Sequence, residues 1–289
     1  IWFIMTPVQE ILSIQYSLAS AKAAMARINK VLELETESDG EIELNDKKVD
    51  ISLKDLSFSY TKDKTTLKNI SFDINSGEKV AIIGASGSGK TTISQLIAGF
   101  YAKNSGDILF NNISIDKISK KSLREHIFLV LQMPILFNNS LRFNLTMGEN
   151  ISDEKILEAL KIAELTSMYK GLKDGLDTVV GKMGIRLSGG QRQRLSIARM
   201  ILANPSVVIF DESTSALDVH TETKLFKNLE QFLKDKTVIT IAHRLSTVKN
   251  ASKIFVLEDG ELVQSGTHNQ LEEQEGHYMD FVKHQLTNS

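Results

Sequence analysis

A short apolar run at residues 80–83 leads directly into a glycine-rich loop at residues 84–91, and this junction constrains the fold more than any other part of the chain. Glycines in such a loop allow positive φ angles and a close approach of the backbone to a ligand, so that successive N–H groups form an anion-binding nest. A helix expected from about Lys90 to Phe100 adds its positive end. Strand, glycine loop and helix in this order predict a phosphate-binding loop in an α/β fold.

Three side chains at the end of this loop suit a nucleotide. Lys90 supplies a point charge for the outer phosphates, the Thr91 hydroxyl suits a magnesium ion, and Thr92 can donate to an inner phosphate. The alternative, an ordinary glycine-rich turn, is disfavoured by the Lys-Thr pair. The candidate phosphate-binding residues are Gly84, Ala85, Ser86, Gly87, Ser88, Gly89, Lys90, Thr91 and Thr92.

Other apolar runs outline the rest of the fold. Residues 49–60 and 67–74 alternate apolar and polar side chains, which predicts antiparallel strands. The runs at 207–210, 238–241 and 254–257 alternate with helix-like stretches, the pattern of a parallel sheet covered on both faces. Residues from about 132 to 170 are mostly helix-like and contain no expected buried strand, which predicts a helical subdomain over about residues 132–190.

Two carboxylates, Asp211 and Glu212, end the apolar run at 207–210. Isolated, such a pair is usually a solvated surface feature. After an apolar strand and beyond a phosphate-binding loop, it instead suits a magnesium site at the carboxyl edge of a sheet.

The run Leu-Ser-Gly-Gly-Gln at residues 187–191 offers a second anion site. Ser188, Gly189, Gly190 and Gln191 lie at the expected start of a helix running to about Leu202, where a hydroxyl and backbone N–H groups are available. This fixed pentapeptide arises by chance in on the order of one in a few thousand chains of this length. One nucleotide cannot easily use two helix N-termini from distant parts of one chain.

Together, residues 84–91, 187–191 and 207–212 resemble the Walker A, signature and Walker B elements of an ABC transporter ATPase, over roughly residues 49–289. The resemblance implies an α/β P-loop NTPase core with a mixed or parallel sheet, an N-terminal antiparallel β subdomain and a helical subdomain. It also implies ATP and Mg²⁺ as ligands, and a head-to-tail dimer in which the signature acts on the partner subunit's ATP. Residues 215–218 resemble the D-loop at that interface.

The same resemblance assigns roles to single residues. Asp211 holds magnesium through water, with Thr91 and Gln132 as further magnesium contacts, and Glu212 is the general base. Gln132 resembles the Q-loop glutamine, although a lone glutamine there usually caps a strand. His243 resembles the switch histidine, although a partly exposed imidazole is the ordinary interpretation. Tyr60 matches in spacing the ring that stacks on adenine; by default it is a cross-strand aromatic.

Exporter-like details surround this core. Apolar residues recur at helical spacing over residues 4–34, which suits either an amphipathic helix on its own domain or the cytoplasmic end of a last transmembrane helix; the resemblance favours the second. Residues 35–48 are polar and predict a linker. The chain begins Ile-Trp-Phe without an initiator methionine, so we interpret it as a piece of a longer protein. The expected domains are 1–34, 35–48 and 49–289.

The resulting hypothesis is the ATPase domain of an exporter in the plasma or inner membrane, facing the cytoplasm and pairing with a second ATPase domain and its own membrane domain. One departure is the loop before the signature, where Lys182 and Met183 replace the charges that exporters usually carry. A soluble ABC ATPase acting on nucleic acid or ribosomes is the alternative, and a nucleotide-binding regulator that does not turn over is another. A net charge of −2 gives no global attraction for nucleic acid, and no cysteine is present.

Overall fold

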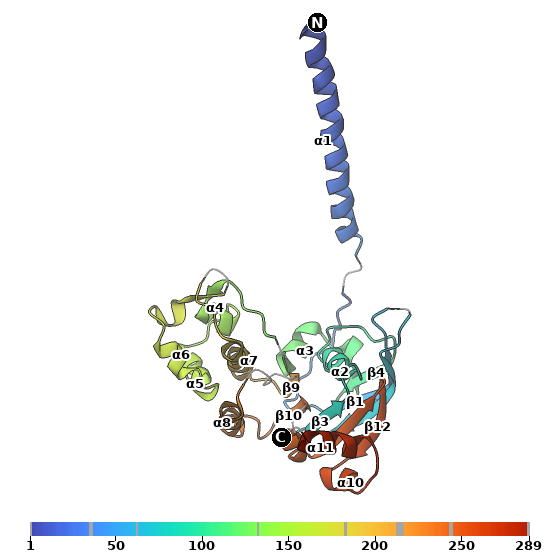
Figure 1. Cartoon of the computed structure of the whole chain (residues 1–289), viewed down its shortest axis with the longest axis vertical. Helices are drawn as coiled ribbons and strands as arrows, with labels where there is room; N and C mark the ends of the chain where they lie inside the picture. Colours follow the sequence, from blue (N-terminus) through green and yellow to red (C-terminus); the bar gives the residue numbers. More distant parts are fainter. Residues whose placement is uncertain are drawn as a thin grey trace. The chain divides into compact units, whose positions relative to one another are not determined.

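The computed structural model describes residues 2–34, 37–61, 63–131, 133–181, 184–211, 217–242 and 245–287. The chain divides into two compact units, residues 1–38 and 39–289 (Figure 1). The first unit is a single helix, α1 (Trp2–Leu32), in which Pro7 lies past the first turn. Within the described ranges, no helix has the length and apolar content that a bilayer crossing requires.

The second unit holds two main sheets. The predicted antiparallel strands are confirmed: β1 pairs with β2, with Leu53 opposite Phe72, and β4 flanks β1 on its other side. In the larger sheet the order is β12-β11-β3-β10-β9-β6, and every neighbouring pair is parallel except β11 with β12. The strands are β1 (Ile51–Phe58), β2 (Leu67–Ile74), β3 (Lys79–Gly84), β4 (Ser105–Phe110), β5 (Ile113–Ser114), β6 (Ile127–Val130), β7 (Asn139–Ser140), β8 (Val179–Val180), β9 (Val207–Asp211), β10 (Thr237–Ile241), β11 (Lys253–Glu258) and β12 (Glu261–Gly266).

Helices cover the larger sheet and form a separate cluster beside it. Figure 1 shows α4 to α7 gathered to one side of the larger sheet, with α7 nearest to its strands. The helices of the second unit are α2 (Lys90–Ile97), α3 (Lys120–His126), α4 (Leu141–Thr146), α5 (Asp153–Ile162), α6 (Thr166–Lys170), α7 (Gly189–Ala203), α8 (Val219–Leu229), α9 (Leu245–Lys249), α10 (His268–Glu272) and α11 (His277–Thr287), with 3-10 turns at Ile115–Lys117 and Gly175–Asp177.

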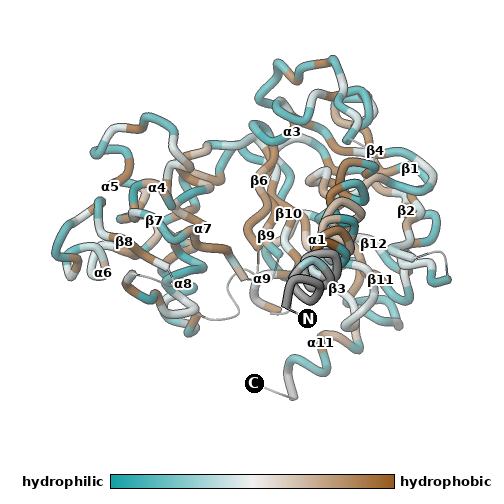
Figure 2. The backbone as a smooth tube through the Cα atoms, turned by 90° about the horizontal axis from the view of Figure 1, so that it is seen from above, coloured by the Kyte–Doolittle hydropathy of each residue, from teal (hydrophilic) through white to brown (hydrophobic). Residues whose placement is uncertain are grey.

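The apolar runs seen in the sequence form the core. Strand β9 is buried along its whole length because both faces are covered, and Figure 2 shows β6, β9 and β10 as a mainly hydrophobic centre. One core cluster joins the antiparallel sheet to α2 and the larger sheet, and Phe72 stacks on Phe255 within it at 4.2 Å between ring centroids. A second cluster joins α5, α7 and α8 to the opposite face.

The structure adds detail to two parts of the chain. Residues 39–48, within the predicted linker at 35–48, group with the second unit: Leu44 is 5% exposed, and its N–H donates to the Ser122 hydroxyl at 2.8 Å. Two apolar side chains, Ile42 and Leu44, among polar neighbours form too weak a pattern to predict this packing. The helical subdomain also contains the short strands β7 and β8; β7, within residues 132–170, is not buried, whereas Val180 in β8 is fully buried.

Glu164, in the turn after α5, joins two helices of this region. Its carboxylate accepts hydrogen bonds from Lys224 Nζ at 2.8 Å and Asn228 Nδ2 at 2.6 Å, both on α8. Burial opposes ionisation, but these bonds and the nearby charges of Lys224 and Arg194 outweigh it and lower the pKa of Glu164 below its ordinary value.

Candidate functional site

The glycine loop lies between the end of β3 and the start of α2, as the sequence predicts. Gly84, Gly87 and Gly89 have φ angles of 151°, 84° and 102°. A Cβ atom on Gly84 would lie 2.1 Å from the Leu257 carbonyl oxygen, whereas one on Gly87 would meet nothing within 4 Å. Glycine is therefore required at residue 84 by packing, and at residue 87 by backbone conformation.

Lys90 is buried and folds back over the loop. Its Nζ donates to the carbonyl oxygens of Gly84 at 2.9 Å and Ala85 at 2.8 Å. These bonds hold the ammonium group across the loop, at the start of α2. A buried ammonium at a helix N-terminus favours an anion at this position.

Ser88 supports the same conclusion. Its hydroxyl oxygen is buried and has no hydrogen-bond partner within the described part of the chain. A buried hydroxyl without a hydrogen-bond partner costs on the order of 1–3 kcal/mol of free energy. A phosphate oxygen that accepts a hydrogen bond from Ser88 would remove this cost.

Thr91 and Asp211 lie together although 120 residues separate them. The Thr91 hydroxyl donates to Asp211 Oδ1 at 3.2 Å, and Asp211 is 5% exposed at the carboxyl end of β9. Parallel pairing through β10 brings the ends of β3 and β9 to one edge of the sheet. A hydroxyl and a carboxylate oxygen are the donors that Mg²⁺ prefers, and Mg²⁺ commonly takes only one or two carboxylates besides phosphates and water, so these residues fit that ion.

Tyr60 lies on the same cavity as the loop. A cavity of about 680 Å³ is lined by both. Its lining residues are Tyr60, Thr61, Lys64, Thr65, Thr66, Lys68, Ser86, Gly87, Gly89, Lys90, Thr91, Thr92 and Asp259. These described lining residues include three lysines and one aspartate, an excess of positive charge that suits an anionic ligand.

Several of these lining residues were not expected from the sequence. Thr61, Lys64, Thr65 and Thr66 follow Tyr60 in the chain. The sequence hint that this segment could bind an anion was its two lysines, Lys62 and Lys64. Asp259 reaches the cavity because the turn between β11 and β12 packs on the start of β2, where the Lys68 N–H donates to the Gly260 carbonyl at 2.8 Å. That contact depends on tertiary packing and leaves no local pattern.

Tyr60 is held in a defined position. Its ring contacts Phe58 and Tyr101 edge to face, with centroid distances of 4.9 Å and 5.2 Å. Its hydroxyl lies 3.1 Å from Thr92 Oγ1 and donates to Gln95 Oε1 at 3.1 Å. Tyr60 as a whole remains 50% exposed, which leaves part of the side chain accessible to a stacking base.

The signature residues lie apart from this cavity. Ser188 caps α7, and its hydroxyl accepts from the Gln191 N–H at 3.2 Å while Gln191 Oε1 accepts from the Ser188 N–H at 2.8 Å. Gly189 and Gly190 form the first turn of that helix. None of these four residues is among the described residues that line the 680 Å³ cavity.

Some predicted site residues lie outside the described ranges. Gln132, Glu212, His243 and the loop residues Lys182 and Met183 belong to this group, as does the Ser215-Ala216 half of the expected D-loop. Of the D-loop, Asp218 is described: it caps α8, its carboxylate accepting from the Thr221 N–H at 2.9 Å. That hydrogen bond lowers the pKa of Asp218.

Fold and loop together define a P-loop NTPase domain. The chain belongs to the ABC transporter family, whose model matches residues 67–215. It is 40% identical over 284 residues to the ATP-dependent lipid A-core flippase of Mannheimia succiniciproducens, a match that covers 97% of this chain and 48% of that protein. Against the flippase of the same name from Haemophilus influenzae it is 40% identical over 287 residues, covering 98% and 49%.

A solved structure is similar as well. A bacterial Atm1-family ABC exporter with ATP bound superimposes with a TM-score of 0.84 at 32% identity, covering 92% of this chain and 47% of that one. The chain thus spans about half the length of the relatives that it matches. It carries the ATP-binding ATPase domain of an ABC transporter.

Proposed function

We propose that this chain binds ATP with Mg²⁺ in the 680 Å³ cavity, pairs head to tail with a second ATPase domain, and hydrolyses ATP to drive export across a membrane. One observation carries the proposal: two separate anion-binding helix starts, at Lys90 and at Ser188, occur in one chain, and only the first lines the cavity. A second subunit supplies the partner that the signature helix needs.

In this proposal each end of the cavity recognises a different part of ATP. The exposed part of the Tyr60 ring stacks on adenine, and the glycine loop with Lys90 and Thr92 binds the phosphates. Thr91 and Asp211 hold Mg²⁺, which supplies charge neutralisation at the outer phosphates. Gln132 contributes to that site, Glu212 acts as general base, and His243 contacts the outermost phosphate.

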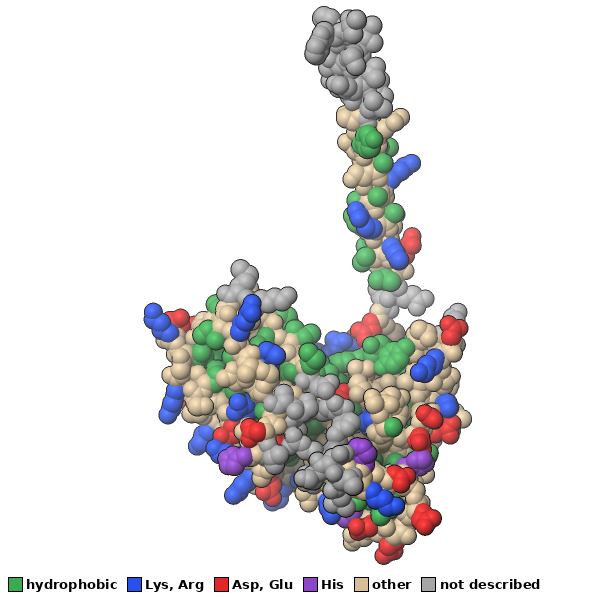
Figure 3. Space-filling model, in the orientation of Figure 1, with side chains coloured by type: hydrophobic (Ala, Val, Ile, Leu, Met, Phe, Trp, Pro, Cys, Tyr) green, Lys and Arg blue, Asp and Glu red, His purple; other side chains and the backbone are tan. Residues whose placement is uncertain are grey.

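Apolar surface supports a membrane-domain partner. Hydrophobic side chains gather on the part of the molecule that contains α4 to α7, at the upper left of the body in Figure 3. Met133, Ile135 and Phe137 are 80%, 71% and 49% exposed. A cavity of about 590 Å³ lies beside them, lined partly by Ile135 and Phe137, and exposed apolar clusters of this kind mark interaction surfaces.

From the names of the relatives we extend to this chain ATP-driven export and a membrane location, and we further propose that the ATPase domain lies on the cytoplasmic side. The same names favour an exporter over an ATPase that acts on nucleic acid or ribosomes.

A dimerisation assay tests the proposal. The variant Glu212→Gln should retain ATP unhydrolysed, so size-exclusion chromatography with light scattering should give a dimer with ATP and a monomer without it. Adding Ser188→Ala to that variant should weaken the dimer while leaving ATP binding to the monomer intact. A monomer at saturating ATP and high protein concentration would contradict the composite site.

A further inference from the structure

Arg199, near the end of α7, is a buried cation whose described partners are all uncharged. It is 9% exposed. Its guanidinium donates from Nη1 to the Ile135 carbonyl at 2.9 Å, from Nη2 to Asn144 Oδ1 at 3.1 Å, and from Nε to the Asn144 carbonyl. Burial lowers its pKa to about 10, so the side chain stays charged at neutral pH.

Asn144, on α4, is fully buried and continues this network. Its Oδ1 accepts from the Phe137 N–H at 2.8 Å. Its Nδ2 donates to the carbonyls of Phe137 at 2.9 Å, Ser140 at 3.0 Å and Asn139 at 3.3 Å. Arg199 and Asn144, here called the clamp, therefore hold the backbone of residues 135–140 through hydrogen bonds.

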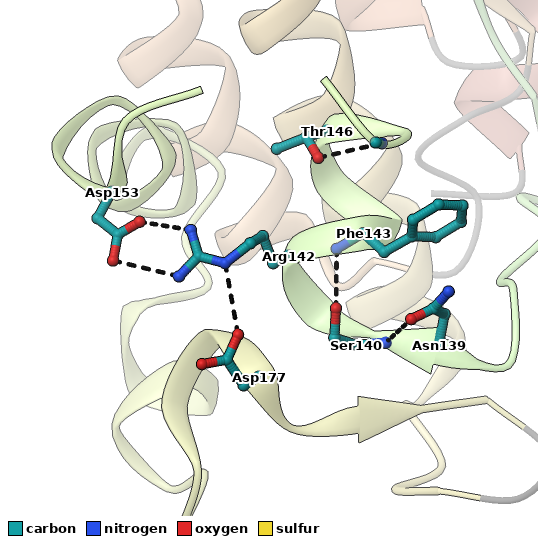
Figure 4. Close-up of polar contacts among 8 residues, drawn as sticks. Asn139, Ser140, Arg142, Phe143, Thr146, Asp153 and Asp177 are labelled. Atoms are coloured by element: carbon teal, nitrogen blue, oxygen red, sulfur yellow. Dashed lines mark hydrogen bonds and ion pairs between the residues drawn. The ribbon is translucent and has the colours of Figure 1, made fainter. Parts of the chain in front are cut away.

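Residues 135–140 also reach the other end of α7. Asn139 and Ser140 form β7, which pairs with Val180 and Val179 of β8, and Figure 4 shows this pair of strands beside the start of α4. Ile185 is hydrogen-bonded to this pair of strands, its N–H donating to the Val179 carbonyl at 3.0 Å, and it lies three residues before Ser188, the cap of α7. The same six-residue segment is thus joined to the chain just before the signature and, through the clamp, to α7 near its end.

These two attachments, near the end of α7 and just before its start, together fix its orientation. Arg199 lies 11 residues after Ser188, about 16 Å along a helix. A helix is a stiff element, so fixing it near its end and fixing the chain before its start sets the direction in which its N-terminus points. A guanidinium suits the first contact because its planar fork reaches three acceptors at once, which an ammonium on a flexible stem does not reproduce.

We infer that Arg199 is a positioning residue: with Asn144 it ties residues 135–140 to α7, so that a displacement of this segment moves Ser188, Gly189 and Gly190 relative to the ATP of the partner subunit. The inference rests on the proposed function for its consequence, but the mechanical connection stands on the described contacts. Ile135 and Phe137, on the exposed side of the same segment, give a partner protein access to it.

Hydrogen exchange tests the connection without requiring activity. In the 289-residue chain without nucleotide, Arg199→Lys should raise amide exchange by at least tenfold in residues 135–141 and also in residues 187–193. Arg142→Gln is the matched control, because Arg142 on α4 pairs with Asp153 and Asp177 on the outside of the same region (Figure 4), and its hydrogen bonds and ion pairs among the described residues do not include the clamp. That variant should leave residues 187–193 unchanged.

A second pair of variants covers the case in which Arg199→Lys does not fold. Phe137→Pro removes the ring and the N–H from which Asn144 accepts and also fixes φ, at a half-exposed residue outside helices and strands, whereas Phe137→Ala removes the ring but retains that N–H. Exchange in residues 187–193 should rise in the proline variant alone. If residues 135–141 loosen while residues 187–193 keep their original protection, the clamp does not position the signature.

Hydrolysis gives the functional consequence. With Arg199→Lys, kcat for ATP should fall at least tenfold while the Kd for ATP binding to the monomer stays within twofold, because the clamp does not line the nucleotide cavity. Equal losses in kcat and in ATP affinity would contradict a positioning role. A parent chain that neither dimerises nor hydrolyses ATP would refute the proposed function, and the exchange results would still decide the mechanical connection.

Discussion

Replacing Tyr60 tests whether the cavity recognises the base separately from the phosphates. Tyr60→Ala removes the ring of a residue that is 50% exposed beside the glycine loop. Stacking of a base on an aromatic side chain contributes about 1–3 kcal/mol. At about 1.4 kcal/mol per factor of ten, the Kd for ATP should rise about 5- to 140-fold.

Tyr60→Phe separates the ring from its hydroxyl. This variant keeps the stacking surface and the edge-to-face contacts with Phe58 and Tyr101. It loses the hydroxyl contacts to Thr92 and Gln95, which join side chains within the protein and not the protein to the ligand. Their loss affects the free and the ATP-bound protein alike, so we expect a Kd for ATP within about threefold of the original.

Calorimetric titration with ATP and with inorganic triphosphate measures both effects. Triphosphate contacts only the glycine loop, so its affinity should stay constant in both Tyr60 variants. Tyr101→Ala is the control, because Tyr101 belongs to the same aromatic cluster but does not line the cavity. Equal weakening of ATP and triphosphate, or no weakening of ATP in Tyr60→Ala, would refute base stacking at this residue.

Three further predictions concern stability. Gly84→Ala should reduce the free energy of unfolding by about 2–3 kcal/mol in urea titrations, because its Cβ meets the Leu257 carbonyl at 2.1 Å and its φ is positive; an unchanged midpoint would contradict this. Leu44→Ala should cost about 2–4 kcal/mol, whereas the same change at Leu34, which is 67% exposed, should cost less than about 0.5 kcal/mol. The pKa of Glu164 is lowered in the folded state, so its stabilising contribution is complete above the unfolded pKa of about 4.3 and is lost as pH falls through the lower folded value. The stability difference between the parent chain and Glu164→Gln should accordingly shrink between pH 7 and pH 3, and a constant difference would show that this carboxylate does not contribute.

Local sequence patterns were sufficient for the glycine loop and for strands such as β1, β2, β3, β9, β10 and β11, but not for β4, β5, β7 and β8. The apolar runs at residues 80–83 and 207–210 became β3 and β9 because each is buried on both faces, which continuous apolar sequence encodes directly. The helix after the loop was placed well at its start but ends at Ile97, since Gly99 turns the chain with a φ of 72°.

Contacts between distant segments were not predictable in the same way. Asp259 enters the cavity through packing of one turn on another strand, and Leu44 is buried by a segment 78 residues away. The clamp is a stronger example. Arg199 and Asn144 bind mainly backbone carbonyls, and a carbonyl acceptor is present in every residue, so no sequence pattern marks the partner.

The cap of α7 restricts what the signature serine can offer to a ligand. A serine hydroxyl has one proton to donate and two lone pairs that accept. In the cap, an acceptor site of Ser188 is already directed at the Gln191 N–H, so the hydroxyl faces any incoming group chiefly as a proton donor. Selectivity at this helix start would then follow from hydrogen-bond complementarity: a group rich in acceptors, such as an ionised phosphate, is matched by the hydroxyl proton, and a group that can only donate is matched less well.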